Sequence, residues 1–382
     1  MPLDLSITPI VRGSEITDHK RCPQKWYWRW RQGLFPKART SDALAFGTWV
    51  HAAFAAWYCG PGLLRGPHPA ETFALLAQDD LRLFKTTDPT EEEVAKYTDL
   101  RELGLVLLDL YVQTYGRDES WSIIAPEQTF KLDVPFPEHW SGETRKIMAR
   151  FAGTFDLPFR DLRTGWIWIG EHKTAGSIRL GHLPLDDQAG RYWAVAYRTL
   201  LNQGLIKPTD RIHGIMYNFI RKALPDPRPV DAQGYFVNKP TKPHYVAAIT
   251  AHQPDALTGK ETLEKLATIA ATLGVEVIGD RSKIQPKPLF LRHPVTRTRP
   301  EQKSQLLRVQ KDLEVMEMHR RGELPITKTT HHSCERFCDF YHMCVIHEAS
   351  GNWKDIRKLT FNVQDPYADH RKSTEDHGSF EF

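Results

Sequence analysis

The order of strands and helices in the middle of the chain constrains the fold more than any other feature. Three stretches have the alternation and the aromatic and β-branched content of successive strands: "WSIIAPEQTFKLDVPF", "RKIMARFAGTFDLPFRDL" and "GWIWIGEHKTA". A helical stretch, "LDDQAGRYWAVAYRTLL", and a further strand, "IHGIMYNFIRK", follow them. With helical segments on both sides, this β-β-β-α-β order predicts one α/β domain with helical additions.

The regions around this core are mostly helical. We expect helices in residues 14–31, 41–58 and about 70–115, and again in about 254–273 and 300–321. The proline-rich interval from Leu224 to His244 is expected to form a long loop. The predicted organisation is a single domain over residues 1–365 with a helical insertion at about 60–118 and an excursion at about 222–325, a cysteine segment at 326–350, and a mobile tail at 366–382.

Composition excludes several classes of protein. No apolar run approaches the roughly 18 residues of a membrane span, and "MPLDLSITPIVRG" lacks the pattern of a signal peptide. We therefore expect a soluble, cytoplasmic protein without a membrane partner. Five cysteines in 382 residues do not form a disulfide framework, which favours metal or cluster ligation. The formal net charge of +4 does not by itself indicate a nucleic-acid partner.

The end of the third strand carries the first candidate for chemistry. In "IGEHKTA", strand alternation places Glu171 and Lys173 on one face and His172 on the other. Asp156, in "FAGTFDLPF", lies on a strand expected to pair with this one through a short turn near Gly165. Two carboxylates beside a lysine form an oxygen-rich site for Mg²⁺ or Mn²⁺, at which the lysine orients a water or balances charge on phosphate. A surface turn with an ordinary ion pair is the alternative.

Three further polar residues could complete such a site. His51, in "GTWVH", lies in an apolar helix, where it is either a core histidine or a metal ligand. Gln188 and Tyr192 are four residues apart and share one helix face. They either lie at the edge of the core or form a polar pair that braces the site or contacts the scissile strand.

The cysteines form a second constellation. Cys334, Cys338 and Cys344 cluster in "HHSCERFCDFYHMC", whereas Cys22 lies near the start of the chain in "KRCPQKW". Three clustered thiols and a distant one fit a Cys₄ iron–sulfur cluster that joins the two ends of the chain. Tetrahedral zinc is the rival, although its usual pattern of two cysteine pairs fits less well. Cys59 lies outside the set and is expected to be an inert buried thiol.

A basic and aromatic segment follows Cys22. Residues 20–39 contain seven lysines and arginines and no acid, and Trp26, Tyr27, Trp28 and Trp30 are interleaved with them. Cations for phosphates and rings for unpaired bases would form a grip on single-stranded DNA. The residues expected to contact DNA are Lys25, Trp28, Arg29, Trp30 and Arg31. Alternatively, the aromatic residues pack around the cluster and the basic residues are solvated.

Taken in order, these motifs resemble a known family. The cysteine of "RCP", then "GTWVH", "GTFD", "EHKT", the Gln188–Tyr192 pair and "CxxxCxxxxxC" are similar to the RecB-type nucleases of the PD-(D/E)XK superfamily. The most similar branch carries an iron–sulfur cluster and includes the Cas4 nucleases and the AddB nuclease domain. The resemblance runs from about Ser14 to Cys344. It implies a restriction-endonuclease-like α/β core, with a mixed central β-sheet flanked by helices.

The resemblance also implies roles for individual residues. The metal ligands would be His51, Asp156, Glu171 and the backbone carbonyl of His172. Lys173 would be the catalytic lysine, and Gln188 and Tyr192 would form the QxxxY motif. The four cysteines would hold a [4Fe-4S] cluster: Cys22, Cys334, Cys338 and Cys344.

This chain departs from the family pattern at several points. Ala55 stands where many relatives have a glutamate, four residues after the motif histidine, and the first clustered cysteines are spaced CxxxC instead of CxxC. The chain is also much longer than a minimal Cas4 nuclease, which puts a role in CRISPR adaptation in doubt. Glu127, at the start of the first strand, is a further residue that could approach the site.

The function implied is a metal-dependent DNA exonuclease that prefers single-stranded ends, in DNA recombination or repair or in the processing of phage DNA. A recombination or replication protein is a possible partner. The alternative function is a non-catalytic DNA-binding or assembly protein, including an adaptation-like component, that retains the nuclease fold.

Overall fold

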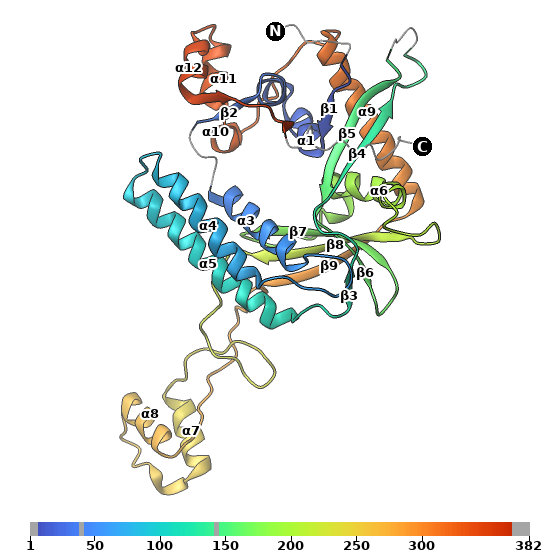
Figure 1. Cartoon of the computed structure of the whole chain (residues 1–382). Coiled ribbons are helices and arrows are strands. Elements are labelled where there is room, and N and C mark those ends of the chain that lie inside the picture. Colours follow the sequence, from blue (N-terminus) through green and yellow to red (C-terminus); the bar gives the residue numbers. More distant parts are fainter. Residues whose placement is uncertain (1–6, 38–41, 141–144, 369–382) are drawn as a thin grey trace. The chain divides into compact units, whose positions relative to one another are not determined.

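The computed structural model describes residues 7–37, 42–140 and 145–368 (Figure 1). The chain divides into two compact units. The main unit comprises residues 1–222 together with 290–382, and the smaller unit comprises residues 223–289. All the residues to which the sequence assigned chemistry belong to the main unit.

The main unit is built around a five-stranded mixed sheet. Its strands lie in the order β3 (Trp121–Ile123), β6 (Leu157–Asp161), β7 (Ile167–Ala175), β8 (Ile212–Arg221) and β9 (Phe290–Thr296). β7 and β8 are parallel, and the other neighbouring pairs are antiparallel. The parallel pair requires a crossover, which helix α6 (Asp187–Asn202) supplies. This mixed sheet with its flanking helices confirms the predicted α/β fold class.

Two smaller sheets lie beside the central one. In the first, β5 (Ile147–Phe155) pairs in parallel with β1 (Ile10–Arg12) and antiparallel with β4 (Gln128–Pro135). In the second, β2 (Leu34–Pro36) pairs antiparallel with β10 (Phe361–Val363). Asp156 alone separates β5 from β6. The chain therefore passes from one sheet to another at this residue, which frees its backbone from regular pairing.

Alternation along β7 divides its side chains between two helical layers (Figure 1). On one face, the ring of His172 stacks on Phe54 of helix α3 (Asp42–Trp57), with ring centroids 4.5 Å apart. Helices α4 (Pro69–Lys85) and α5 (Glu91–Tyr115) pack outside α3. On the other face, Ile167 and Ile169 join the core formed with α6 and α9 (Arg299–Arg321). β7, the strand that carries Glu171 and Lys173, thus lies at the centre of the main unit.

The cysteine-bearing segments from the two ends of the chain form one substructure. The N-terminal part contains α1 (Gly13–Arg21), α2 (Pro23–Trp26) and a π-helical turn, η1 (Tyr27–Arg31). The C-terminal part contains α10 (Cys334–Phe337), α11 (Tyr341–Glu348) and α12 (Trp353–Thr360). Trp28 lies in a small core between them, together with Leu34, Phe340, Met343 and Phe361. The predicted helix over residues 14–31 is therefore broken at Cys22, directly before Pro23.

The smaller unit is a helical excursion between β8 and β9. It contains α7 (Lys242–His252), a short 3₁₀ turn η3 (Pro254–Ala256) and α8 (Leu263–Thr272), around a core of Ile249, Leu266 and Ala270. The expected excursion over about residues 222–325 is too long. β9 returns to the central sheet at Phe290, and α9 packs on α6 because its apolar side chains, such as Val309 and Leu313, belong to the main core.

The predicted tail needs a correction at its start. Tyr367 is buried, donates a hydrogen bond from its hydroxyl to Glu15 at 2.8 Å and accepts one from Arg31 at 3.2 Å. Residues 366–368 are thus fixed on α1 and η1, and the rest of the expected tail lies outside the described residues. Within the described part of the chain, no helix has both the length and the apolar content needed to cross a membrane.

Candidate active site

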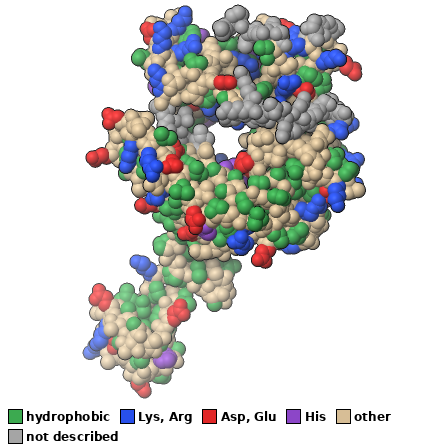
Figure 2. Space-filling model, viewed as in Figure 1, with side chains coloured by type: hydrophobic (Ala, Val, Ile, Leu, Met, Phe, Trp, Pro, Cys, Tyr) green, Lys and Arg blue, Asp and Glu red, His purple; other side chains and the backbone are tan. Residues whose placement is uncertain are grey.

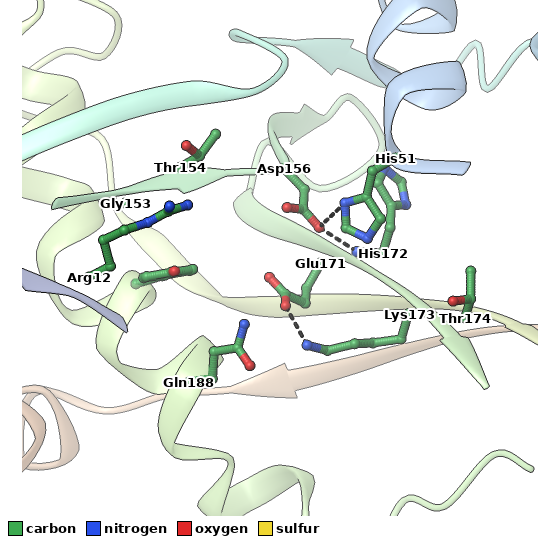
Figure 3. Close-up of a pocket in the computed structure, with 11 residues that line it drawn as sticks. Arg12, His51, Gly153, Thr154, Asp156, Glu171, His172, Lys173, Thr174 and Gln188 are labelled. Atoms are coloured by element: carbon green, nitrogen blue, oxygen red, sulfur yellow. Dashed lines mark hydrogen bonds and ion pairs between the residues drawn. The ribbon is translucent and has the colours of Figure 1, made fainter. Parts of the chain in front are cut away.

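A cavity of about 300 Å³ opens at the point where β5, β7, α3 and α6 meet (Figure 3). In the space-filling view, histidine and acidic side chains border an opening within the main unit (Figure 2). The cavity contains all the catalytic and metal-ligating residues that the sequence suggested. Its lining residues are Arg12, His51, Gly153, Thr154, Asp156, Glu171, His172, Lys173, Thr174, Gln188 and Tyr192.

Asp156 occupies the break between β5 and β6, so its carboxylate can turn toward β7. The carboxylate accepts a hydrogen bond from the backbone N–H of His172 at 2.9 Å. The same oxygen lies 3.5 Å from Nδ1 of His51, which projects from α3 (Figure 3). Burial would raise the pKa of Asp156, but the hydrogen bond and charge of His51 lower it below its usual range.

Glu171 and Lys173 share one face of β7, as strand alternation predicts. The Lys173 ammonium donates a hydrogen bond to the Glu171 carboxylate at 2.6 Å. Glu171 is only 4% exposed, and this burial raises the pKa of its carboxyl although Lys173 opposes the shift. Burial also acts against the charge on Lys173, but Glu171 raises the pKa of the lysine above its ordinary value. The lysine is therefore a fixed cation beside a carboxylate.

Glu127 joins this group from the turn before β4. Its backbone N–H donates to the carbonyl of Asp156 at 2.9 Å, and its φ of 46° bends the chain at this point. Potential ligand atoms of His51, Glu127 and Asp156 all lie within 4.8 Å of one another. Burial and the charge of Asp156 raise the pKa of Glu127 to about 7. The sequence indicated only that Glu127 could approach the site.

This donor set fits a divalent cation. His51, Glu127 and Asp156 offer oxygen and nitrogen ligands of the kind that Mg²⁺ and Mn²⁺ accept. Glu171 lines the same cavity as Asp156, where its carboxylate is bonded to Lys173. Burial disfavours protonation of His51, yet its hydrogen bond to Asp156 and the charges of the three carboxylates raise the pKa of the histidine to about 9. A proton on His51 thus partly balances a cluster of negative charge, which a metal ion would balance more completely.

The backbone of His172 also faces this cluster. β6 pairs with β7 only as far as Gly170, so beyond that residue this edge of β7 has no partner strand in the described part of the chain. The N–H of His172 points to that edge, where it reaches Asp156. Because the N–H and carbonyl of one strand residue project to the same side, the His172 carbonyl faces the same edge. It is thus oriented as its proposed role as a ligand requires.

The side chain of His172 points away from the cavity and is held by a buried polar network. Its Nδ1 lies 2.9 Å from the Asn218 amide nitrogen of β8, and Asn218 also donates to the Tyr111 hydroxyl at 2.9 Å. Arg292 of β9 donates to the same hydroxyl at 2.6 Å. Burial lowers the pKa of His172 to about 3, so its ring is neutral. These supporting residues lie far apart in the sequence and carry no motif that would reveal them.

Helix α6 brings the glutamine and the tyrosine to the cavity. Asp186 caps the helix by accepting hydrogen bonds from the N–H groups of Gln188 and Ala189. Gln188 then points toward Glu171 and Lys173 (Figure 3). Tyr192 lies one turn further on and packs against Gly153, where a Cβ atom would approach its ring to 2.9 Å. The structure thus brings together both residues of the predicted pair.

The four cysteines predicted to bind a cluster also lie near one another: Cys22, Cys334, Cys338 and Cys344. The backbone N–H of Gln24 donates to the Thr327 carbonyl at 3.0 Å, and the N–H of Thr329 points to the Cys22 sulfur at 3.5 Å. Burial raises the pKa of the thiols of Cys338 and Cys344, and the thiols of Cys22 and Cys334 lie near enough to raise both further.

Four thiols with nearby N–H donors are a donor set that suits an iron–sulfur cluster. Lys25 and Lys328 lie close enough to favour the thiolate forms of Cys338 and Cys344, respectively. Cys59 lies apart from this group at the end of α3 and is exposed, so the expectation that it is buried was wrong.

The basic and aromatic segment does not form the predicted stacking surface. Trp28 is 2% exposed and Trp30 is 6% exposed, so neither ring offers a face to a base. Lys25 is paired with Asp18 at 2.6 Å, and Arg31 is paired with the buried Glu15. Trp28 packs beside Cys338 and Cys344, as the alternative interpretation expected, whereas Trp30 belongs to the main core. Lys25 and Arg31 are held in ion pairs, so the expectation that the basic residues are solvated was wrong for these two.

Arg29 borders a second cavity, which Trp30 also lines. Arg29 pairs with Asp339 at 3.2 Å and stacks over the ring of Phe35, 5.2 Å from its centroid.

A sheet edge with convergent carboxylates, a lysine and a glutamine is an arrangement that can hold a divalent metal for the hydrolysis of a phosphodiester. The sequence pattern of the PD-(D/E)XK nuclease superfamily matches residues 14–345 of this chain. The chain belongs to this superfamily. No curated protein matches the sequence.

Proposed function

We propose that this protein is a metal-dependent DNA exonuclease that prefers single-stranded or frayed ends. The observation that carries the proposal is the convergence of Asp156, Glu171 and Lys173 with His51 in one cavity on the fold of a nuclease superfamily. DNA recombination, DNA repair and the processing of phage DNA are the processes that use such an activity.

The titratable and polar residues predicted for the site have separate roles in this proposal. His51, Asp156, Glu171 and the His172 carbonyl would hold Mg²⁺ or Mn²⁺, with Glu127 as a further carboxylate. Bound there, the metal would lower the pKa of a coordinated water and offset negative charge on the phosphate. Lys173 would orient the attacking water and stabilise charge that develops on the phosphate oxygens. Gln188 and Tyr192 would contact the scissile strand from α6.

We also propose that Cys22, Cys334, Cys338 and Cys344 hold a [4Fe-4S] cluster, as in the iron–sulfur branch of the RecB-type nucleases. Two observations support this assignment: the cysteines come together from the two ends of the chain, and N–H groups of residues 329 and 331 point to the sulfurs of Cys22 and Cys334. The cluster would act as a structural link between the two segments.

The dimensions of the cavity support action at a strand end. A cavity of about 300 Å³ lies at the small end of the range for ligand sites, which is about 300–1,000 Å³. Such a space suits one nucleotide of a single strand better than a rigid duplex. The lining is polar and includes Arg12 and Lys173 as cations, which suits a phosphodiester.

Linear and covalently closed single-stranded DNA of the same sequence should therefore differ in their rates of loss. We expect linear strands to be degraded to short products while circles persist, because a circle has no end to enter the cavity. Gel electrophoresis of both substrates, incubated together with Mg²⁺ or Mn²⁺, measures the difference. Equal rates for circles and linear strands would show that the enzyme is an endonuclease.

A further inference from the structure

A second cavity lies in the main unit, next to the cysteine substructure. Its volume is about 390 Å³, and its walls come from α1, η1, β2 and the segment after β10. Among its lining residues are Arg12, Ser14, Arg29, Phe35, Gln364 and Pro366. The size is within the range of about 300–1,000 Å³ that small-molecule sites occupy. It is large enough for one nucleotide.

Arg12 lines this cavity and the active-site cavity as well. β1 pairs in parallel with β5 so that Arg12 lies opposite Ala152, directly before Gly153 and Thr154 of the active-site wall. Asp156 lies four residues beyond Ala152 along the chain, which is about 13 Å at about 3.3 Å per residue. The Arg12 side chain extends along β5 in the direction of Asp156 (Figure 3). Its guanidinium thus lies between the two cavities.

The charge of Arg12 has no acidic partner among the described residues. Its one hydrogen bond there goes from Nη1 to the carbonyl of Pro366, at 3.5 Å. The neighbouring arginines are paired: Arg29 with Asp339, Arg31 with Glu15 and Arg191 with Asp187. A partly buried guanidinium with only one long hydrogen bond among the described residues, beside a site for phosphodiester chemistry, is suited to bind a phosphate in a bidentate manner.

The far side of the second cavity offers a surface for a base. Phe35 lines the cavity, and the guanidinium of Arg29 lies over its ring. Planar groups of this kind stack on nucleobases without strong sequence preference. Asp18 also lines this cavity, but Lys25 and the indole of Trp30 occupy its carboxylate, at 2.6 and 2.9 Å. The negative charge of Asp18 is therefore largely neutralised. Asp365 is a second acid in the lining, and its carboxylate accepts the backbone N–H of Tyr367 at 3.0 Å.

We propose that Arg12 binds the phosphate next to the scissile one and that the second cavity holds the adjoining nucleotide of the same strand. This inference rests on the proposed nuclease function and adds a substrate subsite to it. The DNA would pass from the metal-binding carboxylates, over Arg12, to the cavity beside the cysteine substructure. Contact at a second nucleotide would then hold the strand in register for cleavage.

Binding of single-stranded DNA in EDTA tests the subsite apart from catalysis. We expect Arg12→Ala to weaken the binding of a short fluorescent oligonucleotide by roughly tenfold or more, as one charge-assisted phosphate contact predicts. The slope of log K against log[salt] should fall by about 0.7, the value for one phosphate on a single strand. Arg12→Lys should restore the slope but only part of the affinity, because lysine lacks the planar fork.

Arg82→Ala is the matched control, since it removes an exposed arginine of α4 whose ion pair is with Asp79. It should leave affinity and slope unchanged. Thermal unfolding should be unchanged in both variants, because Arg12 makes one long hydrogen bond and Arg82 is at the surface. Unchanged affinity and slope for Arg12→Ala, with binding by the wild-type protein intact, would overturn the subsite alone. Wild-type protein that binds neither single strands nor duplex would contradict the DNA substrate, and with it the subsite.

Neutral methylphosphonate linkages, placed singly near either end of the oligonucleotide, locate the contact. We expect one position at which neutralisation weakens binding by the wild-type protein but has no effect on Arg12→Ala. If both proteins respond equally at every position, Arg12 does not bind a particular phosphate, and the proposal is wrong.

Discussion

Lys173→Ala is expected to lower the rate of DNA cleavage by about a hundredfold to a thousandfold or more, while the protein still folds and binds DNA. The Lys173 ammonium is fixed 2.6 Å from Glu171 inside the cavity, where it can act on charge that develops in the transition state. A group that acts mainly on the transition state contributes little to the affinity for bound substrate. Single-turnover cleavage of end-labelled DNA, with binding measured separately in EDTA, distinguishes these two effects.

Lys222→Ala provides the control for this experiment. Lys222 follows β8, the strand parallel to β7, but its ammonium lies over the ring of Phe46 and outside the cavity. The Lys222→Ala protein should cleave DNA at the wild-type rate. Cleavage by a cleanly purified Lys173→Ala protein at the same rate as Lys222→Ala would show that the lysine is not catalytic. A loss of DNA binding or of the folded state would instead give it a structural role.

The second large effect is expected at Cys22. Anaerobically purified protein should be brown and contain about four irons per chain, as a cluster with four cysteine ligands requires. Cys22→Ala should lose most of this colour and lower the unfolding temperature, because it releases α1 and η1 from the C-terminal segment. We expect this change to affect the unfolding temperature more than it affects the cleavage rate of the protein that remains folded. Visible absorbance, iron analysis and thermal unfolding measure these changes.

Cys59→Ala is the matched control, because this exposed cysteine lies outside the group of four. It should keep the colour, the iron and the unfolding temperature. A colourless wild-type protein with stoichiometric zinc and full activity would contradict the iron–sulfur assignment. Colour and stability retained in Cys22→Ala would show that Cys22 is not a ligand.

Much of the cavity could be predicted because strand alternation is a local property. A period of two places Glu171 and Lys173 on one face of β7 and His172 on the other, whatever surrounds the strand. Asp156 directly precedes β6, and Glu171 lies on β7. Because a short turn joins these two strands, the sequence also predicted that the two carboxylates approach each other. The helical spacing of Gln188 and Tyr192 similarly fixed their common face.

Residues whose position depends on distant pairing could not be predicted. Arg12 enters the cavity through a three-residue strand that pairs with β5, about 140 residues away, and no local pattern indicates this pairing. For Glu127 the sequence indicated only that it could approach the site, because it does so through a turn with positive φ that is unusual for glutamate. β9 was missed because Pro294 interrupts its pattern, although an edge strand tolerates proline.

The tryptophans show a different limit. Interleaved rings and basic residues have the same local pattern whether they grip DNA or pack a core. Trp28 is buried because Phe340 and Trp353, more than 300 residues away, lie against its ring. Trp30 is buried with Tyr367 beside it and donates to Asp18. Only the tertiary structure distinguishes the two cases. We therefore expect DNA to contact the second cavity, which Arg12 and Arg29 line, instead of these rings.

Incubation of the purified protein with end-labelled linear single- and double-stranded DNA tests the central claim most directly. Parallel reactions would contain Mg²⁺, Mn²⁺ or EDTA. We predict that Mg²⁺ or Mn²⁺ supports cleavage, that EDTA abolishes it, and that single strands are cleaved faster than duplex. DNA that is bound but remains intact in every reaction would contradict the account, as would cleavage that continues unchanged in EDTA. The first result would identify a DNA-binding or assembly protein that retains the nuclease fold without its chemistry.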